Sequence, residues 1–399
     1  MLYHAYQAQA DTLWPLRVAS QAAPRWLTLG EAPVMQRQWA ATCEVFNLTE
    51  VTHRRPDWLV HEAAGQPVVE EVAMQAPFAT LTRFRRRIDQ PGPKVLLVAP
   101  MSGHFATLLR DTVRTLVADH DVYVTDWKSA RDVPLKEGRF GLDEYIAHLI
   151  DFLAFLGPGA HLVAICQPCV AALAAVALMS EDAHPATPAT MTLMAGPIDC
   201  RVNPTGVNEL ATSKPISWFE KNLIQTVPWR LKGAGRRVYP GFVQLSAFMS
   251  MNKERHANTL REYWVNLVEQ QHEKAAPTRD FYREYFAVAD LPAEFYLETV
   301  EHVFQSYGLP RGELTFRGRK VNPAAIRRTA LLTVEGERDD ICSIGQTMAA
   351  HDLCTGIRPY MRKHYVQAGV GHYGVFSGRR WQGQIYPLLR ETIHLFEAA

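Results

Sequence analysis

The stretch HLVAICQPCVAALAAVALM, residues 161–179, decides the fold of this chain. A short apolar run, 162–165, comes before two cysteines at a C-x-x-C spacing, and a longer run of small and apolar residues follows them. This pattern predicts a buried strand that breaks sharply into a buried helix. Cys166 then lies in the turn between strand and helix, and the rest of the sequence has to explain a cysteine at that place.

The composition is that of an ordinary globular enzyme, with 399 residues, 47% hydrophobic and 21% charged. The net charge of +1 is too small to indicate binding to nucleic acid or to an anionic membrane. The longest apolar run, residues 169–179, is too short to span a bilayer, and the first residues lack the pattern of a secretory signal. Six cysteines in a chain of this length do not form a disulfide framework, so we expect a cytoplasmic location.

Strand-like and helix-like segments alternate from residue 68 onward. The runs VVEEVAMQ and FATLTRFRR predict an antiparallel pair at the start. The expected strands after that pair are VLLVAP (95–100), DVYVTDW (121–127), AHLVAI (160–165), MTLMAGP (191–197), TALLTVEG (329–336) and RKHYVQAG (362–369). With helical segments between them, this order predicts an α/β fold with a mostly parallel central sheet and helices on both faces.

The alternation stops between residues 200 and 325, where the pattern is mostly helical and rich in aromatic side chains. An insertion at this point of an α/β sheet lies over the carboxyl ends of the strands, where ligands bind. The sequence therefore predicts an N-terminal helical extension packed on the core (1–67), a first part of the core (68–199), a cap (200–325) and a second part of the core (326–399).

Several roles are open to the two cysteines. A thioredoxin-like pair stands near the start of a small domain, but this one follows at least four strand-like runs. Zinc needs four ligands, and the sequence has no second C-x-x-C and no H-x3-H. Burial as a small hydrophobic residue suits Cys169, which lies on the apolar helix, better than it suits Cys166.

Cys166 occupies the place of a nucleophile. In α/β-hydrolases the nucleophile sits in a strained turn from strand to helix, usually G-x-S-x-G, and its neighbours two positions away must be compact. Here those neighbours are Ala164 and Pro168. The N-terminus of the following helix favours a thiolate over a thiol.

A hydrolase also needs an acid and then a base, each after a later strand. LLTVEGERDDICS supplies Asp339 in a G-x-x-D turn, with Asp340 as its competitor. QAGVGHYGVFSGRRW places His372 in a glycine-rich loop after the last strand, and none of the other histidines combines that context with that order. The oxyanion hole would use two backbone N–H groups, one from Gln167 and one from Met101 or Ser102.

The segments MLYHAYQAQAD, ICQP, VEGERDDI and GVGHYGVFSGRRW resemble the bacterial intracellular polyhydroxybutyrate depolymerases, over nearly the whole chain. The resemblance implies an α/β-hydrolase fold with a Cys-Asp-His triad, which falls on Cys166, Asp339 and His372. The related polyester synthases resemble a G-x-C-x-G elbow, and this chain lacks both glycines. That difference favours the depolymerase.

The implied reaction is nucleophilic acyl transfer on poly(3-hydroxybutyrate) in cytoplasmic storage granules. A 3-hydroxyacyl thioester forms on Cys166, and water activated by His372 releases 3-hydroxybutyrate oligomers or monomer. Coenzyme A is an alternative acyl acceptor. No metal or bound cofactor is expected. The expected partner is the polymer at the granule surface. A homodimer is compatible with the sequence.

Aromatic residues of the cap are candidates for polymer contact, namely Trp218, Trp229, Tyr239, Phe242 and Trp264. The alternative is that these side chains form the cap's own core. Three other functions stay open: a synthase-like acyltransferase, a granule-coating protein without activity, and a thiol-disulfide protein that uses Cys166 and Cys169.

Overall fold

The protein is described by a computed structural model that covers residues 2–27, 32–87, 92–251 and 253–397. Its centre is a nine-stranded sheet. In sheet order the strands are β1 (Glu62–Ala63), β2 (Gln66–Gln75), β3 (Ala79–Arg86), β5 (Asp121–Trp127), β4 (Lys94–Val98), β6 (His161–Ile165), β7 (Thr190–Met194), β13 (Ala330–Gly336) and β14 (Arg362–Gln367). The strands from β1 to β5 pair antiparallel, and all pairs from β5 to β14 are parallel.

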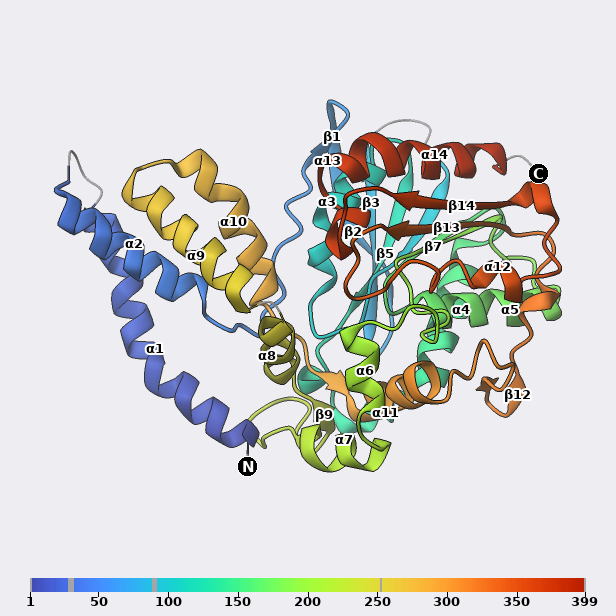
Figure 1. The fold of residues 1–399 in the computed structure, drawn as a ribbon, viewed down its shortest axis with the longest axis horizontal. Coiled ribbons are helices and arrows are strands. Elements are labelled where there is room, and N and C mark those ends of the chain that lie inside the picture. The colour runs from blue at the N-terminus through green and yellow to red at the C-terminus, as the bar shows by residue number, and fades with distance from the viewer. Residues whose placement is uncertain (1, 28–31, 88–91, 252, 398–399) are drawn as a thin grey trace.

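Helices enclose the parallel part of the sheet (Figure 1). They are α3 (Arg110–Leu116), α4 (Leu142–Leu156), α5 (Cys169–Glu181), α12 (Ala350–Leu353), α13 (Gly378–Arg380) and α14 (Tyr386–Leu395). Every residue of β5, β6, β7 and β13 is buried, as expected for strands covered on both faces. The strand order and the turn from β6 into α5 are those of the α/β-hydrolase fold, so the fold class predicted from the sequence is confirmed.

The segment between β7 and β13 is largely helical, as predicted, and its helices are α6 (Gly206–Thr212), α7 (Ile216–Leu223), α8 (Gly241–Met251), α9 (Lys253–Val268), α10 (His272–Tyr285) and α11 (Ala293–Thr299). It also holds two small sheets that the sequence pattern does not predict. One contains β8 (Gln225–Thr226), β9 (Arg237–Tyr239) and β10 (Leu291–Pro292), and the other contains β11 (Thr315–Phe316) and β12 (Arg319–Lys320). Strands of two or three residues are too short to show a period.

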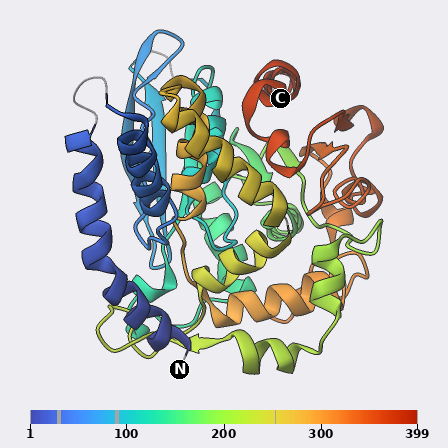
Figure 2. The same ribbon diagram turned by 60° about the vertical axis from the view of Figure 1, so that its left-hand side comes forward.

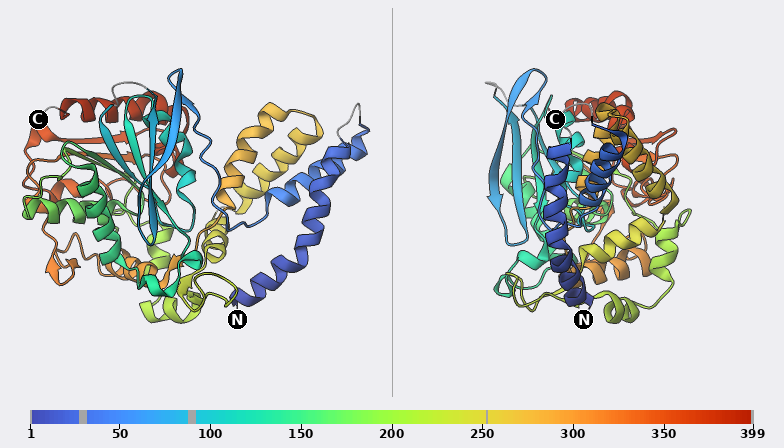
Figure 3. Two further views of the ribbon diagram at one scale, coloured as in Figure 1. Left: turned by 180° about the vertical axis from the view of Figure 1, so that it is seen from behind. Right: turned by 90° about the vertical axis from the view of Figure 1, so that its left-hand side faces the viewer.

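The N-terminal helices α1 (Leu2–Leu27) and α2 (Val34–Leu48) lie on one flank of the molecule beside α9 and α10 (Figure 2; Figure 3). Trp264 on α9 donates a hydrogen bond from its ring nitrogen to the Thr42 hydroxyl on α2, at 3.1 Å. The first two helices therefore pack against the inserted helices. The division of the chain at residues 67, 199 and 325 remains a proposal.

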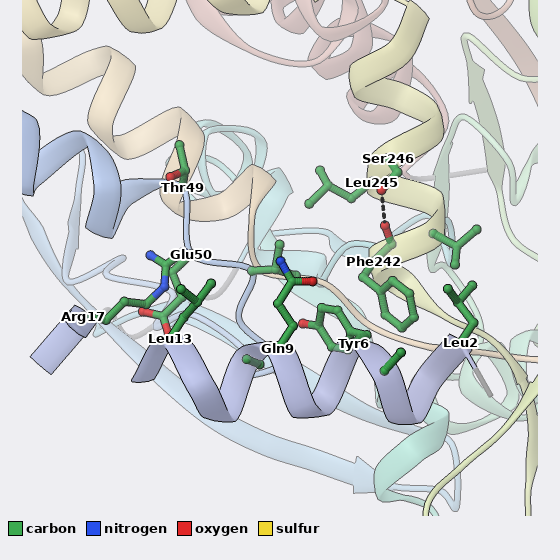
Figure 4. A pocket seen from close by; sticks show the side chains of 14 residues that line it. Leu2, Tyr6, Gln9, Leu13, Arg17, Thr49, Glu50, Phe242, Leu245 and Ser246 are labelled. Carbon is green, nitrogen blue, oxygen red and sulfur yellow. Dashed lines mark hydrogen bonds between the residues drawn. The ribbon is translucent and has the colours of Figure 1, made fainter. Parts of the chain in front are cut away.

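A groove of about 650 Å³ separates α1 from α8 (Figure 4). Near one end the ring of Tyr6 stacks on Phe242, with centroids 4.0 Å apart. Toward the other end the Arg17 guanidinium donates to the Phe46 carbonyl oxygen. Helix α1 thus contacts the rest of the protein at both ends of the groove, and the small side chains of Ala5 and Ala10 are part of the groove lining.

Candidate active site

The turn from β6 into α5 is a strained elbow with Cys166 at its tip. Cys166 has a φ of +67°, in the left-handed region that non-glycine residues rarely adopt. Its N–H donates to the Met194 carbonyl oxygen at 2.8 Å, and its carbonyl oxygen accepts from the Cys169 N–H at 3.2 Å. These contacts hold the backbone in place, and they leave the Cys166 side chain partly exposed beside the end of the sheet. Strain of this kind gathers at functional residues.

Cys169 lies underneath the elbow as a buried thiol. Its Sγ donates to the Ala164 carbonyl oxygen at 3.3 Å. A Cβ at Gly196 would lie 2.2 Å from this sulfur and 3.1 Å from the Cys166 carbonyl oxygen, so the backbone just after β7 approaches the elbow more closely than a side chain at Gly196 would allow. Burial raises the pKa of the Cys169 thiol, which disfavours the thiolate that disulfide exchange requires. Both cysteines are free, and nothing in this geometry favours the thiol-disulfide alternative.

The acid follows β13. Asp339 Oδ2 accepts a hydrogen bond from His372 Nδ1 at 2.8 Å. Its Oδ1 accepts from the N–H groups of Ile341 and Cys342, at 2.9 and 2.8 Å. The Asp339 side chain is fully buried, whereas Asp340 is exposed and lines a pocket beside His372. The spacing of the sequence leaves both carboxylates open, and the geometry brings Asp339 to the histidine.

His372 connects the acid to the cysteine. It begins a short helical turn, His372–Val375, after β14, and its side chain is buried. Burial by itself lowers the pKa of His372, but the negative charges of Cys166 and Asp339, with the hydrogen bond to Asp339, raise it well above the usual value. Cys166, His372 and Asp339 thus form one chain of interactions, the arrangement that activates a nucleophile through a base held by a third group.

The predicted oxyanion residues lie together across the elbow. The Met101 N–H, in the loop after β4, donates to the side-chain oxygen of Gln167 at 3.3 Å. Within the residues that the structure covers, the Gln167 N–H donates to no protein atom. Ser102 follows Met101 in the same loop. Among the described side chains, no group of three or more His, Cys, Asp or Glu is placed to hold a metal ion.

A pocket of about 810 Å³ opens beside His372. Its aromatic lining comes from α8, α10 and the turn at His372, with Phe248, Phe281, Tyr282, Tyr285 and Tyr373. Sequence reasoning missed these side chains. The spacing of Phe281, Tyr282 and Tyr285 indicates one helical face, but it does not indicate what that face meets.

None of the five aromatic residues predicted to contact polymer lines this pocket. Tyr239 is buried and stacks on Tyr296, and Phe242 is buried against the N-terminal helix α1. These two match the alternative of a structural core. Trp218 and Trp229 are exposed, and Trp264 bonds to α2, so a polymer role for these three stays a prediction.

Solved structures similar to this chain include a hydrolase and an esterase. A 2-hydroxy-6-oxo-6-phenylhexa-2,4-dienoate hydrolase from Rhodococcus sp. has 13% identity and a TM-score of 0.46, and the match covers 82% of this chain and 99% of that one. A thermophilic esterase from Thermogutta terrifontis has 14% identity and a TM-score of 0.43, with 82% and 98% covered. Scores this low add nothing to what the strand order establishes.

No curated protein matches the sequence. No helix in the described ranges is long and apolar enough to cross a membrane. The family described as "PHB de-polymerase C-terminus" matches residues 195–397, just over half of the chain, including Asp339 and His372. The chain therefore belongs to the polyhydroxybutyrate depolymerase family, and it is a carboxylic ester hydrolase with an α/β-hydrolase fold.

Proposed function

We propose that this enzyme cleaves the ester bonds of poly(3-hydroxybutyrate) through a thioester on Cys166. The observation that carries the proposal is the buried hydrogen bond between Asp339 and His372, with the charge of His372 coupled to Cys166 in a left-handed elbow. Family membership supports the polyester as the substrate.

The first half of the reaction forms the acyl-enzyme. His372 holds the proton of the Cys166 thiol, and the thiolate sulfur attacks the ester carbonyl carbon. The carbonyl π electrons move to the oxygen, which accepts hydrogen bonds from the N–H groups of Gln167 and Met101. When the carbon–oxygen double bond re-forms, the bond to the leaving alkoxide breaks, and His372 gives that alkoxide its proton. A shortened chain with a hydroxyl end leaves, and a 3-hydroxyacyl thioester remains.

The second half regenerates the enzyme. His372 takes a proton from water, and the hydroxide oxygen attacks the thioester carbonyl carbon. The tetrahedral intermediate expels the Cys166 thiolate, and the acid product leaves. Asp339 keeps His372 in the orientation that both halves need, because its Oδ2 accepts from Nδ1 at 2.8 Å. We propose water as the acyl acceptor.

The aromatic pocket beside His372 supports a polymer substrate. A polyester of 3-hydroxybutyrate has methyl groups and ester carbonyls and no charge along the chain. Phe281 is about one-third exposed, at 36%, and its ring lies edge-on to Tyr373, next to the base. The lining also includes the polar side chains of Arg255, His256, Arg338 and Asp340, and its aromatic part suits the methyl groups of a neutral chain. On this proposal the enzyme works at granule surfaces in the cytoplasm, and sedimentation of the purified protein tests a homodimer.

Mass spectrometry after a brief exposure to a chromogenic 3-hydroxybutyrate ester tests the proposal. We expect a 3-hydroxyacyl adduct on Cys166 in the wild type and in Cys169→Ala, and neither adduct nor ester cleavage in Cys166→Ala. An adduct on another residue, or cleavage retained in folded Cys166→Ala, would refute the mechanism. Product analysis with amorphous polymer, with and without coenzyme A, identifies the acceptor.

A further inference from the structure

We propose that the Gln167 carboxamide gates the oxyanion hole, and that this gate makes the enzyme favour long polyester chains over small esters. The inference rests on the proposed function, because it concerns the same reaction. It assigns to the Gln167 side chain a role separate from that of its backbone N–H.

The backbone N–H groups of Met101 and Gln167, at the elbow, donate to no backbone carbonyl in the described part of the chain. The N–H of Cys166 donates to Met194 and that of Cys169 to Cys166, both to carbonyl oxygens of the backbone. The Met101 N–H has only the Gln167 side-chain oxygen, at 3.3 Å, and the Gln167 N–H has no acceptor in the described part of the chain. Buried backbone N–H groups are almost always paired, and Met101 is buried. Both N–H groups are therefore available to an oxygen from outside the backbone once the Gln167 side chain leaves Met101.

The oxygen that Gln167 brings to Met101 is chemically similar to the oxygen of the substrate. Both are carbonyl oxygens on planar carbon. One N–H makes one good hydrogen bond, so the ester oxygen can bind Met101 only after the Gln167 side chain turns away. That side chain is half-buried, which leaves it solvent to turn into.

The two kinds of substrate meet this obstacle differently. A small ester has only contacts near the reacting carbon to offset the lost hydrogen bond. A polymer chain also contacts the aromatic pocket that includes Phe281 and Tyr373. Binding energy from remote parts of a substrate can be used to reorganise the reacting centre. The gate therefore penalises small esters more than polymer.

Gln167→Met tests the gate, because methionine keeps the length of the side chain and the backbone N–H and removes the carbonyl oxygen. We expect kcat/KM for p-nitrophenyl 3-hydroxybutyrate to rise about 2- to 10-fold, the range for one neutral hydrogen bond. The initial rate on amorphous poly(3-hydroxybutyrate) granules should rise by a clearly smaller factor. Gln167→Glu places a charged acceptor at Met101, and we expect kcat/KM for the small ester to fall. Opposite effects of two substitutions at one side chain are not expected from a structural role.

Alkylation of Cys166 by iodoacetamide checks the elbow in each variant, because that reaction uses no oxyanion hole. Gln167→Leu also removes the acceptor oxygen, and we expect the same changes in rate as for Gln167→Met. Unchanged or lower kcat/KM for the small ester in both acceptor-free variants overturns the gate. Equal rises on ester and polymer overturn the selectivity. A wild type that cleaves neither substrate overturns the proposed function and the gate together, whereas an active wild type with unimproved variants overturns the gate alone.

Discussion

At the scale of single residues, the proposed mechanism makes the reactivity of Cys166 depend on the protonation of His372. The pKa of His372 is raised, so the imidazolium persists as the pH rises through neutrality and loses its proton only above the usual range. In the proposed mechanism, that positive charge pairs with the thiolate of Cys166. A serine at the same place would stay protonated and depend on its base in every step.

This ion pair predicts selective alkylation. Iodoacetamide at neutral pH should label Cys166 faster than the other five cysteines, all of which are buried. His372→Ala removes the imidazolium and should slow the labelling of Cys166 by about tenfold, the lower end of the effect of an adjacent opposite charge. Labelling rates come from mass spectrometry of tryptic peptides. His364→Ala, at a half-buried histidine on β14, is the matched control. Equal rates of Cys166 labelling in the two variants would contradict an ion pair between His372 and Cys166.

The adjacent residues Asp339 and Asp340 show how far the sequence alone can identify the acid. G-x-x-D spacing locates the acid to within one residue, because both carboxylates follow the same strand. Only the folded turn, in which Asp339 Oδ1 accepts two backbone N–H groups, turns Oδ2 toward His372. The order Cys166, Asp339, His372 along the chain can be read from the sequence, whereas the orientation of the Asp339 side chain cannot.

Asp339→Asn should therefore lose about 10²- to 10⁴-fold in kcat/KM for a soluble ester, because a misoriented His372 is a poor base. The amide keeps an oxygen for the turn, so the fold should survive, which a thermal melt checks. Asp340→Asn should lose less than about tenfold, since its side chain is exposed and the His372 Nδ1 hydrogen bond goes to Asp339. The opposite ranking of the two variants would move the acid to Asp340.

At the scale of elements, predictability follows the length and burial of each segment. The strands β4, β6, β7 and β13 around the elbow are largely apolar and buried, and the sequence identifies each of them. The edge strand β14 is polar and mostly half-buried, and its place after the helical segment that follows β13 predicts it. The inserted helices were expected, but their contacts were not. Phe281 on α10 and Trp264 on α9 both belong to amphipathic helices, and only tertiary packing turns the first toward the pocket and the second toward α2.

The pocket face of α10 gives a prediction. Phe281→Ala should slow hydrolysis of amorphous polymer about 2- to 10-fold, the value of one aromatic contact, and change the hydrolysis of a small soluble ester less. Trp229→Ala is the comparison, because Trp229 is the most exposed of the predicted aromatic residues, at 82%, and does not line the pocket. If Trp229→Ala slowed polymer hydrolysis more than Phe281→Ala did, the polymer would contact the exposed aromatic residues predicted from the sequence and not the pocket.

At the scale of the whole molecule, one segment joins the N-terminal helices to the catalytic loop. Residues 286–290 exchange backbone hydrogen bonds with Thr52, and the Ala289 N–H donates to the Gly103 carbonyl oxygen beside Met101 at 2.9 Å. The same segment ends at Asp290, whose buried carboxyl accepts from the Tyr3 hydroxyl at 2.6 Å and from the Gly241 N–H at 2.9 Å. The start of the chain is thereby connected to the loop that we propose supplies part of the oxyanion hole.

Tyr3→Phe measures how much this connection stabilises the protein. Burial raises the pKa of Asp290, and the Tyr3 hydroxyl opposes that rise by stabilising the carboxylate. Without the hydroxyl, a buried carboxyl oxygen lacks its donor, and the free energy of unfolding should fall by about 1–3 kcal/mol. The loss should be larger in mildly alkaline than in mildly acidic buffer, because the unpaired group costs more when it is ionised. Urea denaturation at several pH values measures both effects, with Tyr360→Phe, at an exposed tyrosine, as the matched control. Equal stability of the two variants at every pH would mean that the Tyr3–Asp290 contact does not hold the N-terminal helices to the core.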